Sequence, residues 1–386
     1  MRSCKPDSSL IVRALTVRVF EMPLATALQL SFGGTTARRL CLVEVHVDDN
    51  HGVGETWINY PSWAWRERVE TIIRGVAPLL IGRDVQDIQD THAYLMDSLA
   101  PLGRQWGARG PIWQAISGVD MALWDLHAKR AGRPISRLLS DAPRERVPVY
   151  ASGIGPDRVE ALAETAMSMG HAAFKVRVGF GRSTDRRTIR SLCSVVGNDA
   201  MILADANCAW DVSEAQYMCT ELASLGVRLC EEPLQNATPR SLQAVYRQSH
   251  LPIAVGENVY TLDAFRRYAA ANAVVALQPD VAKTGGITTA AQVDAIASAH
   301  GKRVSPHCYG GAVALLGTLQ LSAALDSLGL VETDVQPNPL RVEPLQQELK
   351  VVDGWVDVPT GPGLGVVCEL DRLRPYEIYS VSETSQ

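Results

Sequence analysis

The chain has 386 residues, more than one ordinary domain of ~150, which leaves room for two or three domains. Apolar residues make up 46% of it and charged residues 20%, which excludes wholesale disorder and the fibrous classes. The formal net charge is −5, and no run of Lys or Arg offers a track for a phosphate backbone, so we expect no nucleic-acid partner.

The cysteines and the N-terminus bear on the cellular compartment. The eight cysteines form no Cys-x-x-Cys pair, and a chain of this length needs no disulfide framework, so we expect reduced thiols. The first residues lack the apolar stretch of a signal peptide, and no window approaches the ~18 uninterrupted apolar residues of a membrane span. We therefore expect a cytoplasmic protein without a membrane partner.

The first part of the chain mixes strands and helices. We expect residues 1–10 to be disordered, and residues 11–20 and 40–47 are predicted strands, the second followed by turn residues. Helical stretches follow, and the clearest has an apolar face made of Ile112, Ile116, Val119, Leu123 and Leu126. This order predicts an α+β unit over residues 11–140.

The pattern changes at Arg146. Eight short apolar runs with polar ends alternate with amphipathic helical stretches: VPVYASG, AAFKVRVG, AMILADAN, VRLCEEP, PIAVGEN, VVALQPD, KRVSPH and GLVETD. Parallel strands need a crossover, usually a helix, and eight such units over ~200 residues have the size of a TIM barrel. We predict an α/β barrel over residues 146–345. An open doubly wound sheet is the alternative, but no Gly-rich phosphate-binding fingerprint accompanies the runs.

Polar side chains occupy the ends of the predicted strands. In chain order they are Lys175 and Arg177, Asp205, Glu231, Glu257, Asp280, His307 and Glu332. From Asp205 onward the intervals are 23 to 27 residues, about one strand-helix unit each. A single carboxylate after a strand is more often a helix N-cap, but capping does not explain such residues in consecutive units. Barrel enzymes place their active sites at this end of the strands.

Three of these residues predict a metal site. Carboxylates from adjacent strands are hard oxygen ligands that suit Mg²⁺, and they are Asp205, Glu231 and Glu257. Zn²⁺ is a poorer match because no His or Cys completes a tetrahedral set. Cys208 and Cys230 flank the carboxylates, but we expect both to point elsewhere. Strand alternation predicts that Glu232 faces away from the metal.

The remaining residues predict acid–base chemistry. A carboxylate beside an imidazole fixes its tautomer and raises its pKa, so Asp280 and His307 predict a general base that works near neutral pH. Lys175 and Arg177 alternate onto one side, where two cations can bind a carboxylate and stabilise an enolate. Glu332 would donate a proton or hydrogen bond to the developing charge if its surroundings keep it protonated.

This constellation resembles the enolase superfamily, in particular its mandelate racemase subgroup, over nearly the whole chain. The matching segments are ALWDLHAKRAGRPISRLL (122–139), FKVRVG (174–179), ADAN (204–207), EEP (231–233), GEN (256–258), QPDVAKTGG (278–286), SPH (305–307) and PTGPGLG (359–365). The resemblance implies a modified (β/α)7β barrel and an N-terminal α+β capping domain, completed by the C-terminal segment 346–386. It also implies a reaction in which Mg²⁺ binds a substrate carboxylate, a base abstracts the α-proton, and an enediolate forms.

The roles that the resemblance implies fall on individual residues. Asp205, Glu231 and Glu257 correspond to the metal ligands, Asp280 and His307 to the dyad, and Glu332 to the electrophilic partner. The expected partner is a small carboxylate, an acid sugar, and we expect a homo-oligomer.

One position departs from the subgroup's pattern. Where this chain has Lys175 and Arg177, the subgroup usually has Lys-x-Lys, and its second Lys is the base on the opposite face of the substrate. A guanidinium, with a pKa above ~12, is a poor base. A racemase needs proton transfer on both faces, whereas a dehydratase works with one: His307 removes the α-proton and then assists departure of the β-hydroxyl. Lys283 is not expected to act as a second-face base, because the dyad of Asp280 and His307 argues against the muconate-cycloisomerase-like subgroup.

The leading hypothesis is therefore an Mg²⁺-dependent acid-sugar dehydratase. A racemase, an epimerase or a lactone cycloisomerase on the same scaffold is the alternative, and a metal-binding homologue without turnover is the third hypothesis. Residues 25–36, with Ser31 and Phe32, resemble the mobile loop that closes over the barrel. The other expected substrate contacts are Trp57, Asn59 and Tyr60 after the second cap strand, and Asn207 and Tyr309 at the barrel mouth.

Overall fold

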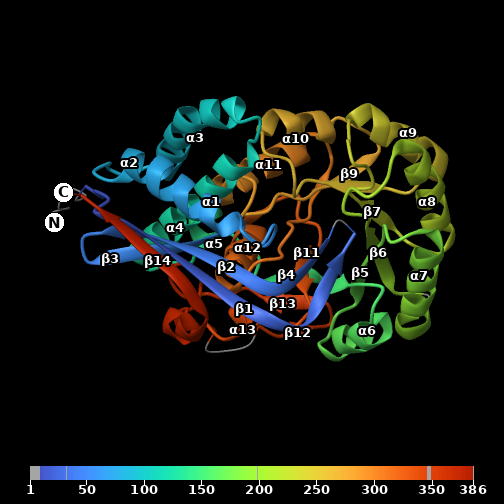
Figure 1. Ribbon diagram of the computed structural model, residues 1–386. Coiled ribbons are helices and arrows are strands. Elements are labelled where there is room, and N and C mark those ends of the chain that lie inside the picture. Colours follow the sequence, from blue (N-terminus) through green and yellow to red (C-terminus); the bar gives the residue numbers. More distant parts are fainter. Residues whose placement is uncertain (1–8, 32, 198, 346–348, 386) are drawn as a thin grey trace.

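A capping unit and a barrel make up this computed structural model, which describes residues 9–31, 33–197, 199–345 and 349–385 (Figure 1). The prediction of disorder for residues 1–10 falls mostly outside this range. Leu10, which is described, is buried, and its backbone N–H donates to Asp84. Phe32 also lies outside the described residues.

The cap contains an antiparallel sheet in the order β14-β1-β2-β3. Its strands are β1 (Ala14–Leu30), β2 (Gly33–Val47), β3 (Asn50–Thr56) and β14 (Glu377–Thr384). The C-terminal segment thus returns to the cap, where Ala14 pairs with Thr384. The segment 25–36, expected to be a loop, is instead the end of a long hairpin of β1 and β2.

The strand β3 was missed because residues 48–52, which overlap its start, were predicted to be a turn. Gly52 and Gly54 lie where β3 packs directly on the backbone of helix α4 (Gly110–Arg130). A Cβ on Gly52 would lie 1.9 Å from the carbonyl oxygen of Ala122, and one on Gly54 would lie 1.9 Å from that of Gly118. These glycines therefore permit close packing of a strand on a helix and do not mark a turn.

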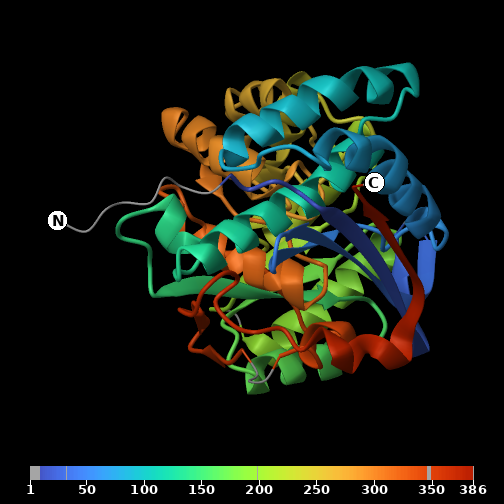
Figure 2. The ribbon, with the colours of Figure 1, turned by 90° about the vertical axis from the view of Figure 1, so that its left-hand side faces the viewer.

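Helices cover one face of this sheet (Figure 2). Besides α4 they are α1 (Ala64–Glu70), the π-helix η1 (Thr71–Val76), α2 (Ala77–Leu80) and α3 (Ile88–Gln105). The short α5 (Ser136–Leu139) packs instead on the barrel helix α12. The five residues predicted to form the apolar face of α4 are all fully buried. No helix in the described part of the chain is long and apolar enough to cross a membrane.

The barrel is confirmed. All eight predicted runs contain parallel strands: β4 (Arg146–Ile154), β5 (Ala173–Arg177), β6 (Met201–Asp205), β7 (Leu229–Glu231), β8 (Ile253–Val255), β9 (Val274–Leu277), β10 (Arg303–Val304) and β11 (Val331–Asp334). They pair in chain order from β4 to β10, and β11 returns to pair with β4. A bridge between Val304 and Leu328 joins the remaining gap, so the sheet closes.

Helices alternate with the barrel strands, which gives the (β/α)7β arrangement. They are α6 (Val159–Ser168), α7 (Arg182–Val196), α8 (Val212–Ser224), α9 (Pro239–Ser249), α10 (Leu262–Ala269), α11 (Gly286–Ala299) and α12 (Ala312–Ala324). After the barrel come α13 (Pro339–Val342), the strands β12 (Val351–Val352) and β13 (Trp355–Asp357), and the 3₁₀ helix η2 (Leu370–Tyr376). The strand β13 adds antiparallel to β4.

The cap lies over the carboxyl ends of the barrel strands. At the hairpin end Ser31 donates through Oγ to the carbonyl of Ala206, 3.4 Å away, just after β6. Farther along β2, Arg38 pairs with Asp334 of β11 at 2.6 Å, and both side chains are buried. Two units distant in sequence therefore enclose the ends of the strands between them.

Candidate active site

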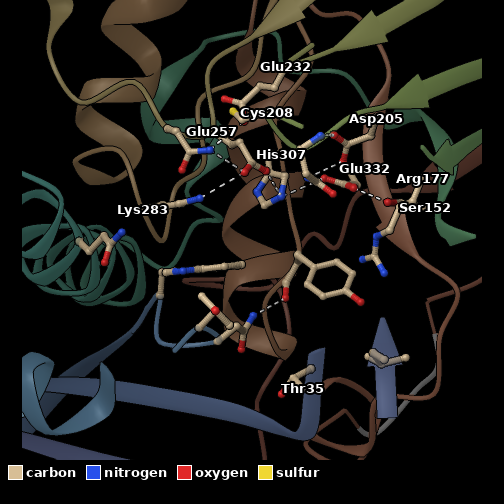
Figure 3. Close-up of a pocket in the computed structure, with 18 of the residues that line it drawn as sticks. Thr35, Ser152, Arg177, Asp205, Cys208, Glu232, Glu257, Lys283, His307 and Glu332 are labelled. Atoms are coloured by element: carbon tan, nitrogen blue, oxygen red, sulfur yellow. Dashed lines mark hydrogen bonds and ion pairs between the residues drawn. The ribbon is translucent and has the colours of Figure 1, made fainter. Parts of the chain in front are cut away.

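The polar residues predicted at the strand ends gather at one place and are all buried (Figure 3). Lys175, Arg177 and Asp205 belong to strands β5 and β6, and Glu231 and Glu332 belong to β7 and β11. The other three follow their strands within a few residues: Glu257, Asp280 and His307. The parallel barrel brings them together because all its strands end at one mouth.

Lys175 lies at the centre of a group of carboxylates. Its ammonium is 2.8 Å from Glu231 Oε2, 2.9 Å from Glu332 Oε1 and 3.7 Å from Asp205 Oδ2. Burial alone would lower the pKa of Lys175, but these carboxylates raise it well above its ordinary value. The side chain is therefore a fixed positive charge beneath the cavity.

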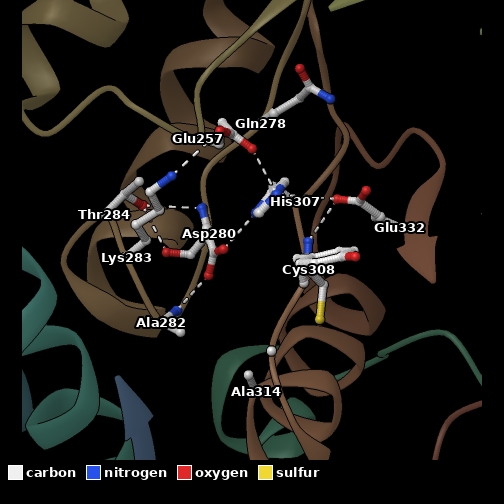
Figure 4. A network of polar contacts seen from close by, with 12 residues as sticks. Glu257, Gln278, Asp280, Ala282, Lys283, Thr284, His307, Cys308, Ala314 and Glu332 are labelled. Carbon is white, nitrogen blue, oxygen red and sulfur yellow. Dashed lines mark hydrogen bonds and ion pairs between the residues drawn. The ribbon is translucent and has the colours of Figure 1, made fainter. Parts of the chain in front are cut away.

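Asp280 and His307 form the predicted pair (Figure 4). Nδ1 of His307 lies 2.6 Å from Asp280 Oδ2, and Nε2 lies 2.7 Å from Glu257 Oε2. Burial would lower the pKa of the imidazole, but Glu257, Glu332 and the hydrogen bond to Asp280 raise it well above its ordinary value. In this arrangement the ring is a cation that donates from both nitrogens, so Nε2 must leave Glu257 before the ring can accept a proton.

Glu332 was expected to donate a proton only if its surroundings keep it protonated, and in this arrangement they favour the ionised form. Burial favours the neutral acid, yet Lys175 and His307 outweigh it and lower the pKa of Glu332 to about 2. Ser152 donates to its Oε1, and the backbone N–H of Cys308 donates to its Oε2 at 3.0 Å. Glu332 is therefore ionised and accepts hydrogen bonds on both oxygens.

The three predicted metal ligands converge, but they face cations of the chain. In the part of the chain that the structure describes, no three His, Cys, Asp or Glu side chains are already arranged to hold an ion. Lys175 forms ion pairs with Asp205 and Glu231, while His307 and Lys283 form ion pairs with Glu257.

The donor set nevertheless fits a divalent cation. Among the described residues the buried Oε1 of Glu231 has no hydrogen-bond partner. Burial raises the pKa of Glu231 to about 8, and the charges of Asp205, Glu332 and Glu257 add to the rise while Lys175 opposes it. A cation with hard oxygen preferences would supply the missing charge.

Arg177 is held as a charged group. Its guanidinium lies 5.1 Å from the ring centre of Tyr309, and Arg38 of the cap lies 4.7 Å from the same ring. Burial would lower the pKa of Arg177, but Tyr309, Asp334 and Asp205 raise it above its ordinary value. Burial at this site therefore does not convert the guanidinium into a base.

A cavity of about 550 Å³ lies above these groups, a size typical of sites for small ligands. Its lining includes five of the predicted substrate contacts, namely Trp57, Asn59, Tyr60, Asn207 and Tyr309. The first three follow β3, the third cap strand, and not the second as expected. Ser31 is absent from the lining and contacts the loop after β6 instead.

Two expectations about neighbours of the metal ligands are wrong. The strand β7 ends at Glu231, and Glu232 has a left-handed backbone with φ of 39°, so alternation no longer applies and its side chain lines the cavity. Cys208, also left-handed, lines it too and donates through Sγ to Glu232 at 3.3 Å. Cys230 is fully buried, as expected.

Sequence reasoning missed further lining residues, namely Leu28, Thr35, Gln114, Ser152, Gln235, Asn258 and Tyr260. Asn258 and Tyr260 follow Glu257 in the loop after β8, so a search of whole strand-to-helix loops would have found them. Leu28 and Thr35 fall within residues 25–36, the segment expected to close over the barrel, whereas no sequence signal indicated that Gln114 of the cap helix α4 reaches the cavity.

Comparison with known protein families identifies the family to which the chain belongs. Residues 14–140 match the sequence model of the mandelate racemase / muconate lactonizing enzyme N-terminal domain, and residues 158–372 match that of the enolase C-terminal domain-like family. The chain belongs to the enolase superfamily, and within it to the mandelate racemase/muconate lactonizing enzyme subgroup.

Individual relatives are enzymes of two kinds. The chain is 29% identical to D-galactarolactone cycloisomerase from Agrobacterium fabrum, over 95% of this chain and 99% of that protein. It is 31% identical to arabinonate dehydratase from Saccharolobus solfataricus, over 87% of this chain and 90% of that protein. A crystal structure of a racemase from Streptomyces coelicolor, with bound magnesium, superposes with a TM-score of 0.85 at 26% identity and covers 95% of this chain and 100% of that one. This chain is therefore an enolase-superfamily enzyme whose relatives are lyases and isomerases.

Proposed function

We propose that this enzyme is an Mg²⁺-dependent acid-sugar dehydratase, which removes the proton α to a carboxylate and expels the β-hydroxyl as water. One observation carries the proposal. The described cavity lining has one imidazole, His307, and on the far side of Glu332 from it lies the buried guanidinium of Arg177 (Figure 3). The site thus offers a base on one face of a substrate and a fixed cation on the other.

The metal would be held by three side chains, Asp205, Glu231 and Glu257. When bound, Mg²⁺ supplies positive charge to the substrate carboxylate and so makes the α-proton more acidic. Lys175 adds a fixed positive charge beneath the same place, since its ammonium lies 2.8 Å from Glu231. Arg177 donates hydrogen bonds and orients a carboxylate or hydroxyl, as planar guanidinium groups do.

His307 moves the proton. Asp280 holds Nδ1 at 2.6 Å, so Nε2 is the nitrogen that faces the substrate once it leaves Glu257. The neutral ring takes the α-proton at Nε2, and the electrons of the C–H bond delocalise into the carboxylate. The protonated ring then gives that proton to the β-hydroxyl, the C–O bond breaks, and water leaves as a carbon–carbon double bond forms. The enol product tautomerises to a 2-keto acid.

A lactone cycloisomerase is the second candidate, and the relative that carries this activity favours it. The same residues perform both reactions if the leaving group at the β-carbon is a ring oxygen, because elimination then opens the ring without loss of water. Racemisation and epimerisation require a proton donor on the opposite face, where this chain has Arg177. The site therefore favours eliminations over inversion at the α-carbon.

Deuterium exchange tests the proposal. Each member of an acid-sugar library, as both pure α-epimers, is incubated with enzyme and Mg²⁺ in D₂O and followed by proton NMR. A dehydratase exchanges or consumes one epimer only and releases a 2-keto acid. Exchange of both epimers at comparable rates would identify a racemase, and ring opening of a lactone would identify a cycloisomerase. No exchange with any acid would leave a metal-binding homologue without turnover.

A further inference from the structure

The cap sheet has two edge strands, and only one of them is covered. At one edge, β3 packs on α4, and five of its seven residues are buried. At the other edge lies β14, in which six of the eight residues from Glu377 to Thr384 are exposed (Figure 2). Among the described residues, β1 is the only strand that pairs with β14. The outer side of β14 is therefore accessible to another strand.

The ladder with β1 shows which backbone groups of β14 point outward. Just beyond the strand, the N–H of Ser385 donates to the carbonyl of Arg13 at 2.9 Å. In an antiparallel ladder every second residue bonds the same neighbour, so the odd-numbered residues of β14 bond β1. The N–H and C=O groups of Ser380 and Ser382 consequently point away from β1, and no strand in the described part of the chain receives them.

The residues of β14 do not protect this edge. Proteins block edge strands with Lys, Pro, a bulge or a covering segment, because free N–H and C=O groups recruit other strands. The strand, EIYSVSET, contains no Lys, Arg or Pro, and its side chains Ile378 and Tyr379 leave apolar surface exposed. The register shift in its pairing with β1 falls at its start, between Glu377 and Tyr379. The rest of the strand is regular and ready to pair.

The two faces of β14 carry different side chains. Val17 and Val19 of β1 are fully buried beneath the cap helices, and their partners in β14 are Val381 and Tyr379. Tyr379 accordingly packs on Trp65 of α1, with 5.4 Å between the ring centres. The serines of β14 lie on the opposite face, because side chains alternate along a strand. A strand added to β14 has to match this alternation.

We infer that β14 pairs antiparallel with β14 of a second copy of this chain, around a twofold axis at Val381. The residues that become opposite are Val381 with itself, Ser380 with Ser382, and Tyr379 with Glu383. Each of these pairs lies on one face of the sheet, and the outward N–H and C=O groups of Ser380 and Ser382 bond each other. The strand thus complements itself, as a twofold interface requires: apolar meets apolar, serine meets serine, and a phenol meets a carboxylate.

The neighbouring registers fit less well. With the axis at Ser380, only residues 379–381 of the regular part overlap. With the axis at Ser382, Val381 lies opposite the carboxylate of Glu383 in both halves of the interface. An axis between two residues would place opposite side chains on different faces, which an antiparallel ladder does not allow. The inference does not depend on the proposed function, because β14 supplies no residue to the described cavity lining.

Disulfide cross-linking tests the register. Cα atoms of a non-hydrogen-bonded pair are about 4.5 Å apart, which a disulfide spans, whereas diagonal neighbours are about 7–8 Å apart. Oxidation with copper phenanthroline should therefore convert Val381→Cys into a reducible covalent dimer, but not Ser380→Cys or Ser382→Cys. The unaltered protein controls for the native thiols. Cross-linking through Ser380→Cys or Ser382→Cys alone, or through none of the three, would overturn the inference.

A proline tests the backbone pairing. Ser380→Pro removes an outward N–H and spares the ladder with β1, since an edge strand tolerates proline where its N–H faces solvent. Ser380→Ala is the matched control, because it loses the hydroxyl but keeps the N–H. Sedimentation should show the unaltered protein as a dimer or a multiple of one. Ser380→Pro should raise the dissociation constant of the dimer on the order of 100-fold, because the axis repeats the lost hydrogen bond.

Ser380→Ala should associate as the unaltered protein does. A single-chain mass for the unaltered protein at every concentration would overturn the inference, and so would undiminished association of Ser380→Pro. Circular dichroism shows whether Ser380→Pro is folded. If it is not, the cross-linking of Val381→Cys decides the question alone, because that variant keeps every backbone N–H.

Discussion

At the scale of single residues, the site is organised by charges that neutralise one another. Lys175 and His307 are cations buried among five carboxylates that include Asp205, Glu257 and Glu332. Each buried charge is stabilised by an opposite charge in contact with it. Removal of one partner leaves the other charge buried and unpaired, which costs free energy of folding. The residues proposed to move the proton and those predicted to hold the metal are thus parts of one electrostatic unit.

The dyad gives the first prediction. His307→Asn abolishes α-proton exchange, because no other side chain takes the proton on that face. Asp280→Asn reduces exchange on the order of 10²- to 10⁴-fold, since the ring loses its orientation and its pKa falls. The acidic limb of the pH profile of exchange should therefore move to lower pH in Asp280→Asn. Exchange by His307→Asn near the rate of the unaltered enzyme would contradict the mechanism.

The second prediction concerns the metal. Asp205→Asn and Glu257→Gln should each abolish Mg²⁺ binding in calorimetry, and Mg²⁺ should raise the melting temperature of the unaltered enzyme but not of these variants. Glu164→Gln, an exposed carboxylate on α6, is the control and should bind as before. Undiminished Mg²⁺ affinity in either site variant would remove that residue from the ligand set.

At the scale of elements, Glu55 joins the cap to the barrel. Its carboxylate accepts from the backbone N–H groups of Gly311, at 2.6 Å, and Ala314, at 2.8 Å, at the start of α12. Burial nevertheless raises its pKa from an ordinary 4.5 to about 7, although these two donors oppose the rise. A strand of the cap therefore ends in a carboxylate that faces the N-terminus of a barrel helix.

This carboxylate predicts a pH-dependent stability. Its pKa is higher in the folded than in the unfolded chain, so its contribution is complete below pH ~4.5 and is lost as the pH rises to ~7. The loss is at most about 3 kcal/mol in the free energy of unfolding. Glu55→Gln should flatten the dependence of denaturant unfolding on pH across this window, and Glu164→Gln should not. An unchanged pH dependence in Glu55→Gln would contradict the raised pKa.

The barrel elements and their polar ends were predictable from the sequence, because each is a local signal: a buried run followed by a charged residue. The cap was less so. Residues 48–52 indicated a turn locally, and only the packing against α4 shows why a strand contains Gly52 and Gly54. Glu232 was misplaced because alternation holds only while a strand continues. Gln114 reaches the cavity through the docking of two units, which no local pattern encodes.

At the scale of the whole molecule, a buried ion pair spans the two units. Arg38 of the cap and Asp334 of the barrel are 2.6 Å apart with side chains 4% and 0% exposed. Arg38 also lies against Tyr309, which in turn contacts Arg177. The contact between the cap and the barrel is therefore linked to the side chains that line the cavity.

The ion pair gives a prediction by double substitution. Arg38→Met leaves the charge of Asp334 buried without a partner and should lower the free energy of unfolding by about 3–5 kcal/mol. Arg38→Met combined with Asp334→Asn removes both charges and should recover most of this loss. Denaturant unfolding of the four proteins measures the coupling. If the double variant is as unstable as the sum of the single ones, the two residues do not act as a pair.

The pairing of β1 with β14 has a consequence for how the protein is made. Ala14 pairs with Thr384, 370 positions later (384 − 14), so this edge of the cap sheet has no partner while the ribosome synthesises the barrel. At 5–20 residues per second, that interval lasts roughly 20–75 s. Most barrel strands pair with near neighbours in the chain, whereas β1 must wait for β14. The strands β1 and β2 supply Leu28 and Thr35 to the cavity wall, so the sheet that holds these residues gains its fourth strand only after β14 has been synthesised.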